Sequence, residues 1–120
     1  MKILIVDDSR VMRQIVTRTL RQAGFGGHDL VEAADGRQAL DLAASERPDL
    51  IISDWNMPEL TGVEVLRRLR AAGNGVRFGF VTSECTPEMQ EQAREAGAEF
   101  FIVKPFTAER FGQVFTPILG

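Results

Sequence analysis

The sequence predicts an α/β fold, a doubly wound five-stranded parallel sheet with a helix after each strand. Within 120 residues, short apolar runs alternate five times with segments of helical periodicity. Several runs are apolar almost throughout, as in parallel strands that helices cover on both faces. Right-handed connections between such strands place helices on both faces of the sheet. We expect strands at Lys2–Val6, Asp29–Ala33, Leu50–Asp54, Val76–Val81 and Phe100–Val103.

The helix after the first strand has an apolar stripe at i, i+3, i+4 spacing that runs from Met12 to Ala23. Either Ser9 or Asp8 can accept a hydrogen bond from the first turn and cap the helix. Gly24 can end it, because glycine readily adopts the left-handed conformation.

The next two helices are shorter. The second is expected over Arg37–Ser45, and Pro48 prevents it from continuing into the third strand. The third is expected over Val63–Ala71, where Gly73 and Gly75 mark its end.

The fourth helix has the clearest start, with Thr86 as the cap and Pro87 at the first helical position. The fifth follows Thr107, and Gly112 and Pro117 weaken it, so that its last turn is left open.

Composition restricts the class of protein. The net charge is −3 and no face dense in Lys or Arg is needed to explain any segment, which disfavours nucleic-acid binding. No apolar run approaches the length of a membrane span, and the N-terminus lacks the pattern of a signal peptide. Cys85 is the only cysteine and His28 the only histidine, so a disulfide within the chain and a Cys/His metal cluster are excluded. We therefore expect one cytoplasmic domain over residues 1–120, with Cys85 as a bystander.

Polar side chains follow four of the five predicted strands. In an open parallel sheet, ligands bind beyond the carboxyl ends of the strands, so these residues are expected at one rim. They are Asp7, Asp8, Asp54, Asn56, Thr82, Ser83, Glu84 and Lys104.

Three carboxylates at one rim repel each other unless a cation lies between them. Mg²⁺ suits a site made of oxygen ligands, and Asp54 can then attack phosphorus to form an aspartyl phosphate. Lys104 adds positive charge and Thr82 a hydroxyl donor. Each feature alone has an ordinary explanation: adjacent acids complement a helix dipole, and a loop lysine is usually solvated. Their combination predicts a phosphoryl-accepting site.

Four segments in order resemble the receiver domain of two-component response regulators, and most closely its single-domain chemotaxis (CheY-like) type. They are Asp7-Asp8-Ser9-Arg10, Asp54-Trp55-Asn56-Met57-Pro58, Thr82-Ser83-Glu84 and Lys104-Pro105-Phe106-Thr107. The resemblance covers the whole chain and implies the flavodoxin-like strand order 2-1-3-4-5.

The resemblance also implies the role of each residue in the site. Asp54 would take the phosphoryl group from a phosphohistidine of a sensor histidine kinase. Asp8 and Asp54 would bind Mg²⁺ directly, Asn56 through its backbone carbonyl, and Asp7 largely through water. Lys104 would pair with the acyl phosphate.

The expected output also comes from the resemblance. Thr82 would bond a phosphoryl oxygen, and the switch aromatic three residues before the lysine is Phe101. The chemotaxis type usually has tyrosine there, whereas this chain has no tyrosine. The fourth helix, fifth strand and fifth helix would form the output face, with Phe101 and Phe106 as candidate partner contacts. Asn56 and Glu84 match the rapidly dephosphorylating type.

The favoured interpretation is a stand-alone receiver that docks on a flagellar switch or motor protein or on a kinase. It would be a phosphoacceptor signalling domain rather than an enzyme, although it would assist its own phosphorylation and dephosphorylation. Two alternatives stay open: a receiver cut from a longer transcription factor or output enzyme, and an interaction module that works without phosphorylation. A flavodoxin would need a Ser/Thr/Gly-rich loop where this chain has Asp7-Asp8, and a haloacid dehalogenase-type phosphatase would need an Asp-x-Asp pair there. P-loop and Gly-x-Gly-x-x-Gly patterns are lacking.

Overall fold

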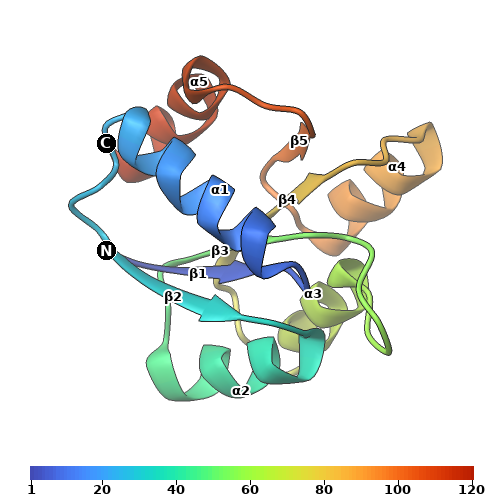
Figure 1. Cartoon of the computed structure of the whole chain (residues 1–120). Coiled ribbons are helices and arrows are strands. Elements are labelled where there is room, and N and C mark those ends of the chain that lie inside the picture. The colour runs from blue at the N-terminus through green and yellow to red at the C-terminus, as the bar shows by residue number, and fades with distance from the viewer.

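Five strands and five helices alternate along the chain in the computed structural model, which describes residues 1–120. Figure 1 shows the sheet in the middle, with α1 and α5 on one face and α2, α3 and α4 on the other. The strands are β1 Lys2–Val6, β2 Asp29–Ala33, β3 Leu50–Ser53, β4 Arg77–Thr82 and β5 Phe101–Val103. The helices are α1 Arg10–Gln22, α2 Gly36–Glu46, α3 Gly62–Ala71, α4 Pro87–Ala96 and α5 Ala108–Leu119.

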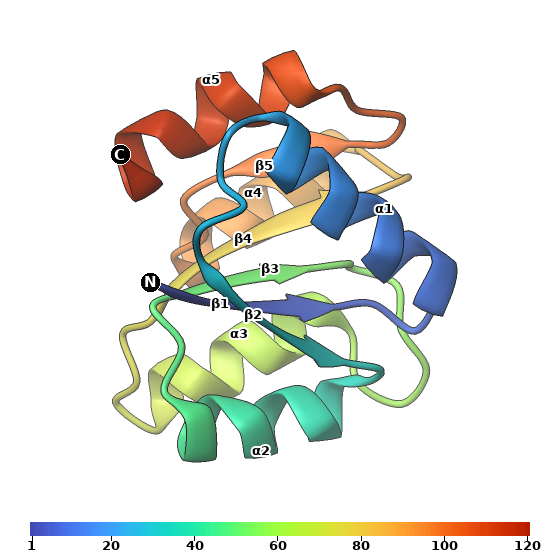
Figure 2. The same cartoon turned by 60° about the vertical axis from the view of Figure 1, so that its left-hand side comes forward.

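All neighbouring strands are parallel and lie in the order β2-β1-β3-β4-β5, which confirms the predicted fold class and strand order. The order reverses at β1 and β3, so the rim beyond these two strands is the switch point at which this class of sheet binds ligands. Figure 2 shows both termini at the same end of the sheet, away from the arrowheads of β1 and β3.

The sheet separates two apolar cores, because successive side chains of a strand point to opposite faces. Ile51 and Phe80 belong to the core under α2, α3 and α4, whereas Ile52 and Val81 belong to the core under α1 and α5. The side chains of all four strand residues are almost completely buried. The near-continuous apolar runs in the sequence follow from this double coverage.

The expected caps are present. Ser9, rather than Asp8, caps α1: its hydroxyl accepts a hydrogen bond from the Met12 N–H at 3.2 Å. Thr86 and Thr107 cap α4 and α5 in the same way. Gly97 is left-handed at the end of α4, with φ of 98°.

Several predicted boundaries are wrong by one residue. β3 ends at Ser53, so Asp54 lies just beyond the ladder, and β4 is shifted to Arg77–Thr82, so Thr82 is its last residue. β5 begins at Phe101 rather than Phe100, and α2 and α3 begin one residue early at Gly36 and Gly62. Boundaries depend on the last ladder or helix hydrogen bond, which side-chain patterns do not specify.

The fifth helix continues to Leu119 despite Gly112 and Pro117. Pro117 has no N–H, so the helix lacks one hydrogen bond in its last turn. Phe111 and Phe115 are completely buried against the sheet and hold the helix in place. No helix of the structure has the length and apolar character needed to cross a membrane.

Candidate functional site

The first acidic residues come from the end of β1. Asp7 is still attached to the sheet, because its N–H donates to the Ala33 carbonyl at 3.1 Å. Its side chain turns inward, so that the residue is only 3% exposed, and its Oδ1 accepts a hydrogen bond from the Ser9 N–H at 2.9 Å. Asp8 is exposed at the rim. The pair therefore places one buried and one solvated carboxylate above β1.

Asp54 occupies the matching place beyond β3. Its N–H donates to the Val6 carbonyl at 2.9 Å, which ties it to the end of β1. Its Oδ1 accepts a hydrogen bond from the Trp55 N–H at 2.7 Å. This backbone bond orients the carboxylate, which is half-buried.

Lys104 reaches the acids from β5. Its Nζ lies 3.2 Å from Asp7 Oδ2 and 3.7 Å from Asp54 Oδ2. Its own N–H donates to the Thr82 carbonyl at 2.8 Å, so the lysine is fixed to the end of β4, and the Lys104–Pro105 peptide bond is cis. The ammonium group of Lys104 thus lies between the carboxylates of Asp7 and Asp54, which are 47 positions apart in the chain.

The electrostatics of the site are those of crowded acids. One carboxylate oxygen from each of Asp7, Asp8 and Asp54 lies within 4.8 Å of the others. Burial raises the pKa of Asp7 above its usual range and the nearby Asp54 adds to this, while the Ser9 N–H and Lys104 act in the opposite direction. A cation between these groups would relieve the repulsion.

The donor set fits Mg²⁺. Its side-chain ligands are all carboxylates, and hard oxygen ligands are those that Mg²⁺ prefers. His28 and Cys85, the only histidine and the only cysteine of the chain, contribute nothing to the cluster. Asn56 is exposed and lies two residues after Asp54 in the loop before α3.

Thr82 ends β4 beside the site and is completely buried. Its Oγ1 has no hydrogen-bond partner in the protein, which is costly for a buried hydroxyl. Its capacity to donate is therefore unused within the protein, and the side chain would have to turn out of the core to reach a ligand. Glu84 lies two residues further on and is exposed.

The two candidate partner contacts lie in different surroundings. Phe101 on β5 is half-buried and lines a hollow of about 510 Å³ together with residues of α4. Phe106 packs on Phe111, with ring centroids 4.6 Å apart, and lines a second hollow of about 400 Å³ beside Lys104 and α1. Each residue thus lines a hollow that the other does not, and both line a third hollow of about 310 Å³ along β5.

Sequence reasoning missed three residues of the site. Trp55, to which the sequence analysis assigned no role, is only 6% exposed. Arg13 donates from Nη1 to the Asp7 carbonyl at 2.7 Å and pairs with Glu32 at 2.9 Å. Gly62 lies against Asp54 so closely that a Cβ would be 2.1 Å from its carbonyl oxygen. Of these three residues, only Gly62 could have been noticed in the sequence, because a glycine directly follows the helix cap Thr61.

The comparisons with known proteins agree with this geometry. The family model of the response regulator receiver domain matches residues 3–116. The chain is similar to the chemotaxis protein CheY of Pseudomonas aeruginosa, with 39% identity over the full length of both chains. It is 40% identical to the response regulator MprA of Mycolicibacterium vanbaalenii over 90% of its own length, but spans only 46% of that relative.

Solved structures give the same result. Chemotaxis protein CheY4 of Vibrio cholerae, crystallised at low pH, superimposes with a TM-score of 0.85 and 38% identity, covering 98% of both chains. The receiver domain of the putative response regulator NarL of Mycobacterium tuberculosis has a TM-score of 0.84 at 28% identity, over 93% of this chain and 90% of that one. With the match over almost the whole chain, the predicted fold and the acidic rim beyond β1 and β3, this chain belongs to the response regulator receiver family.

Proposed function

We propose that this chain is a two-component phosphorelay receiver that accepts a phosphoryl group on Asp54 with the help of Mg²⁺. The observation that carries the proposal is the convergence of three carboxylates and one lysine on the switch point of the sheet. Such a site positions a nucleophile among cations, which is most of what phosphoryl transfer requires.

Asp54 is the proposed nucleophile. One of its carboxylate oxygens forms a bond to the phosphorus of a phosphohistidine while the P–N bond breaks, and the leaving imidazole nitrogen keeps the electron pair and takes a proton from solvent. The Trp55 N–H orients the Asp54 carboxylate, and Lys104 offers its ammonium group to the transferred oxygens. Asp8, Asp54 and the Asn56 carbonyl would hold Mg²⁺, with Asp7 acting largely through water, and the bound ion would supply positive charge that offsets the acids and the phosphoryl oxygens.

The proposed response begins at Thr82. Its unpaired hydroxyl donates to a phosphoryl oxygen, which draws in the end of β4 and the loop that leads to α4. Phe101 then changes its position on β5, and the α4-β5-α5 face alters for a downstream partner. The mechanism is a shift between two pre-existing populations.

The proposed setting is the cytoplasm, with a sensor histidine kinase as the phosphodonor. We propose a phosphoacceptor rather than an enzyme with a substrate of its own. The full-length similarity to chemotaxis proteins supports a chemotaxis-type output, in which the partner is a flagellar motor protein or another kinase. Asn56 and Glu84, both exposed in loops that adjoin Asp54 and Thr82, are the proposed cause of rapid self-hydrolysis.

A second function is favoured by one observation. The similarity to MprA covers only about half of that response regulator. On this alternative, the chain is the receiver part of a longer regulator, and Asp54 controls an output domain in the same polypeptide. The chemistry at Asp54 is the same in both cases.

The test uses acetyl phosphate and Mg²⁺ with intact-mass measurement. Wild type should gain one phosphoryl group, and both Asp54→Asn and removal of Mg²⁺ by EDTA should abolish the gain. The matched control is Asp41→Asn, an exposed acid on α2, which should be phosphorylated like wild type. Equal modification of Asp54→Asn would refute the assignment and favour a module that works without phosphorylation.

A further inference from the structure

The residue next to the phosphoacceptor, Trp55, contacts the switch aromatic directly. We infer that Trp55 is a positioning residue that couples the state of Asp54 to Phe101 through ring contact, on a route separate from Thr82. The inference rests on the proposed function and adds a residue to it.

Trp55, Phe80 and Phe101 form a cluster of three mutually contacting rings, the aromatic triangle. The ring centroids of Trp55 and Phe80 are 4.8 Å apart, those of Trp55 and Phe101 6.1 Å, and those of Phe80 and Phe101 6.0 Å. All three separations fall in the range in which aromatic rings attract one another. Trp55 is therefore part of the core beneath α3 and α4 rather than a surface aromatic.

The backbone of Trp55 is tied to the phosphorylation site. Its N–H donates to Asp54 Oδ1 at 2.7 Å, and its carbonyl accepts a hydrogen bond from the Gly62 N–H at 2.8 Å. The first bond is strengthened by the negative charge of the carboxylate. Formation of an acyl phosphate turns the carboxylate into an acyl group and places the negative charge on the phosphoryl oxygens, so the bond from the Trp55 N–H to Oδ1 weakens on phosphorylation.

Phe101 is the member of the aromatic triangle that is free to move. Phe80 is completely buried and is the register partner of Phe101 across the β4–β5 ladder. Phe101 is half-buried and lines the hollow beside α4. Phe101 has no hydroxyl, so only ring packing stabilises its inward position. The loss of one aromatic pair changes the equilibrium between the inward and outward positions about two- to tenfold.

Thr82 does not duplicate this route. Its register partner on β5 is Val103, two residues beyond Phe101, and its hydroxyl makes no hydrogen bond within the protein. Trp55, by contrast, touches both ends of the connection, the Asp54 carboxylate through its N–H and Phe101 through its ring.

The experiment is ¹⁹F NMR on protein labelled with 4-fluorophenylalanine, with beryllofluoride and Mg²⁺ as the phosphoryl mimic. The chain has eight phenylalanines, and Phe101→Leu assigns the Phe101 resonance. Bound beryllofluoride gives its own ¹⁹F resonance, which reports occupancy of the Asp54 site independently of Phe101. The variants are Trp55→Leu, which removes the ring, and Trp55→Phe, which keeps a smaller one.

In wild type, beryllofluoride should shift the Phe101 resonance. In Trp55→Leu the mimic should still bind, while the change in the Phe101 equilibrium falls about two- to tenfold, and Trp55→Phe should restore part of it. A full Phe101 shift in Trp55→Leu would overturn the inference and leave the proposed function intact. Absence of the bound beryllofluoride resonance in wild type would overturn both.

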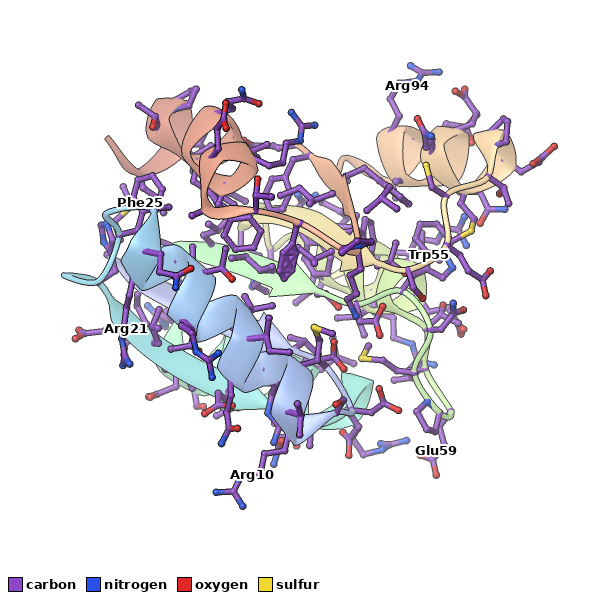
Figure 3. The ribbon with its side chains drawn as sticks, turned by 45° about the horizontal axis from the view of Figure 1, so that its top comes forward. Arg10, Arg21, Phe25, Trp55, Glu59 and Arg94 are labelled. Carbon is purple, nitrogen blue, oxygen red and sulfur yellow. The ribbon has the colours of Figure 1, made fainter.

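A second measurement does not require a change at Trp55. Phe101→Leu should reduce the response of Trp55 fluorescence to beryllofluoride, because the two rings are in contact. The matched control is Phe25→Leu: Phe25 packs on Phe115, and Figure 3 shows it at the opposite end of the molecule from Trp55. Phe25→Leu should leave the fluorescence response as in wild type. If beryllofluoride changed Trp55 fluorescence equally in Phe101→Leu and Phe25→Leu, the coupling would be contradicted.

Discussion

At the scale of single residues, the site contains groups whose resting state is unfavourable. Burial raises the pKa of Asp7, so the folded chain binds a proton at Asp7 more tightly than the unfolded chain does. Stability therefore falls as the pH rises from the ordinary range of an aspartate through the raised pKa. The charge that would bind a cation is maintained at the expense of stability.

Asp7→Asn removes this charge and tests its cost. Without Mg²⁺, the variant should be more stable than wild type at neutral pH. The difference in unfolding free energy should increase as the pH rises through the raised pKa of Asp7. Urea unfolding in EDTA at a series of pH values measures it. A variant less stable than wild type at neutral pH would mean that the attraction between Asp7 and Lys104 outweighs the cost of burial.

Thr82 gives a second residue-scale prediction. Thr82→Val keeps the shape of the side chain and removes a buried hydroxyl that has no partner, so the resting protein should gain about 1–2 kcal/mol of unfolding free energy. The control is Thr19→Val, because the buried Thr19 hydroxyl donates to the Ile15 carbonyl at 2.8 Å and its loss should bring no gain. A similar loss of stability in both variants in denaturant titrations would contradict the unpaired state of Thr82.

At the scale of elements, the loop between β3 and α3 determines where Asp54, the proposed phosphoacceptor, lies. Its end is held by a capping box, in which Thr61 and Glu64 exchange hydrogen bonds. The Gly62 N–H then donates to the Trp55 carbonyl, which folds the loop back over the end of β3. The close approach of Gly62 to the Asp54 carbonyl follows from this path.

Gly62→Ala should displace that loop. A Cβ would be 2.1 Å from the Asp54 carbonyl oxygen and 2.9 Å from Phe80 Cε1, so the backbone must move, at a cost of about 1–3 kcal/mol. Phosphorylation by acetyl phosphate should slow as well. Gly112→Ala is the control: nothing lies within 4 Å of its Cβ, and alanine in a helix should add about 0.5–1 kcal/mol of stability. Loss of stability in Gly112→Ala, with none in Gly62→Ala, would contradict this assignment of crowding.

At the scale of the whole molecule, local patterns predicted the fold well. The alternation of apolar runs with helical stripes placed all ten elements, because a doubly covered parallel sheet imposes that pattern on the chain. The strand order came from the resemblance to receivers rather than from the pattern, and the structure confirms it. Polar residues at strand ends likewise placed the acids at one rim, since parallel strands share one carboxyl edge.

What the sequence did not reveal depends on contacts between distant segments. Trp55 lies in a loop, where periodicity carries no information on burial, and it is buried because Phe80 and Phe101 lie beneath it. The bond from Arg13 to the Asp7 carbonyl and the crowding at Gly62 arise in the same way. The separate surroundings of Phe101 and Phe106 also follow from tertiary packing, with α4 beside one and α1 beside the other.

Metal binding should link the acidic rim to the stability of the entire fold. A cation that binds only the folded chain adds about 2.7 kcal/mol at one hundred times its Kd, which for a domain of this size raises Tm by roughly ten degrees. Calorimetry with Mg²⁺ and with EDTA measures the shift. Asp8→Asn should remove most of it, because Asp8 is the exposed member of the carboxylate cluster, whereas Asp41→Asn on α2 should retain it. A rise in Tm that is equal in wild type and Asp8→Asn would mean that Mg²⁺ binds elsewhere, and the ligand assignment at the rim would fail.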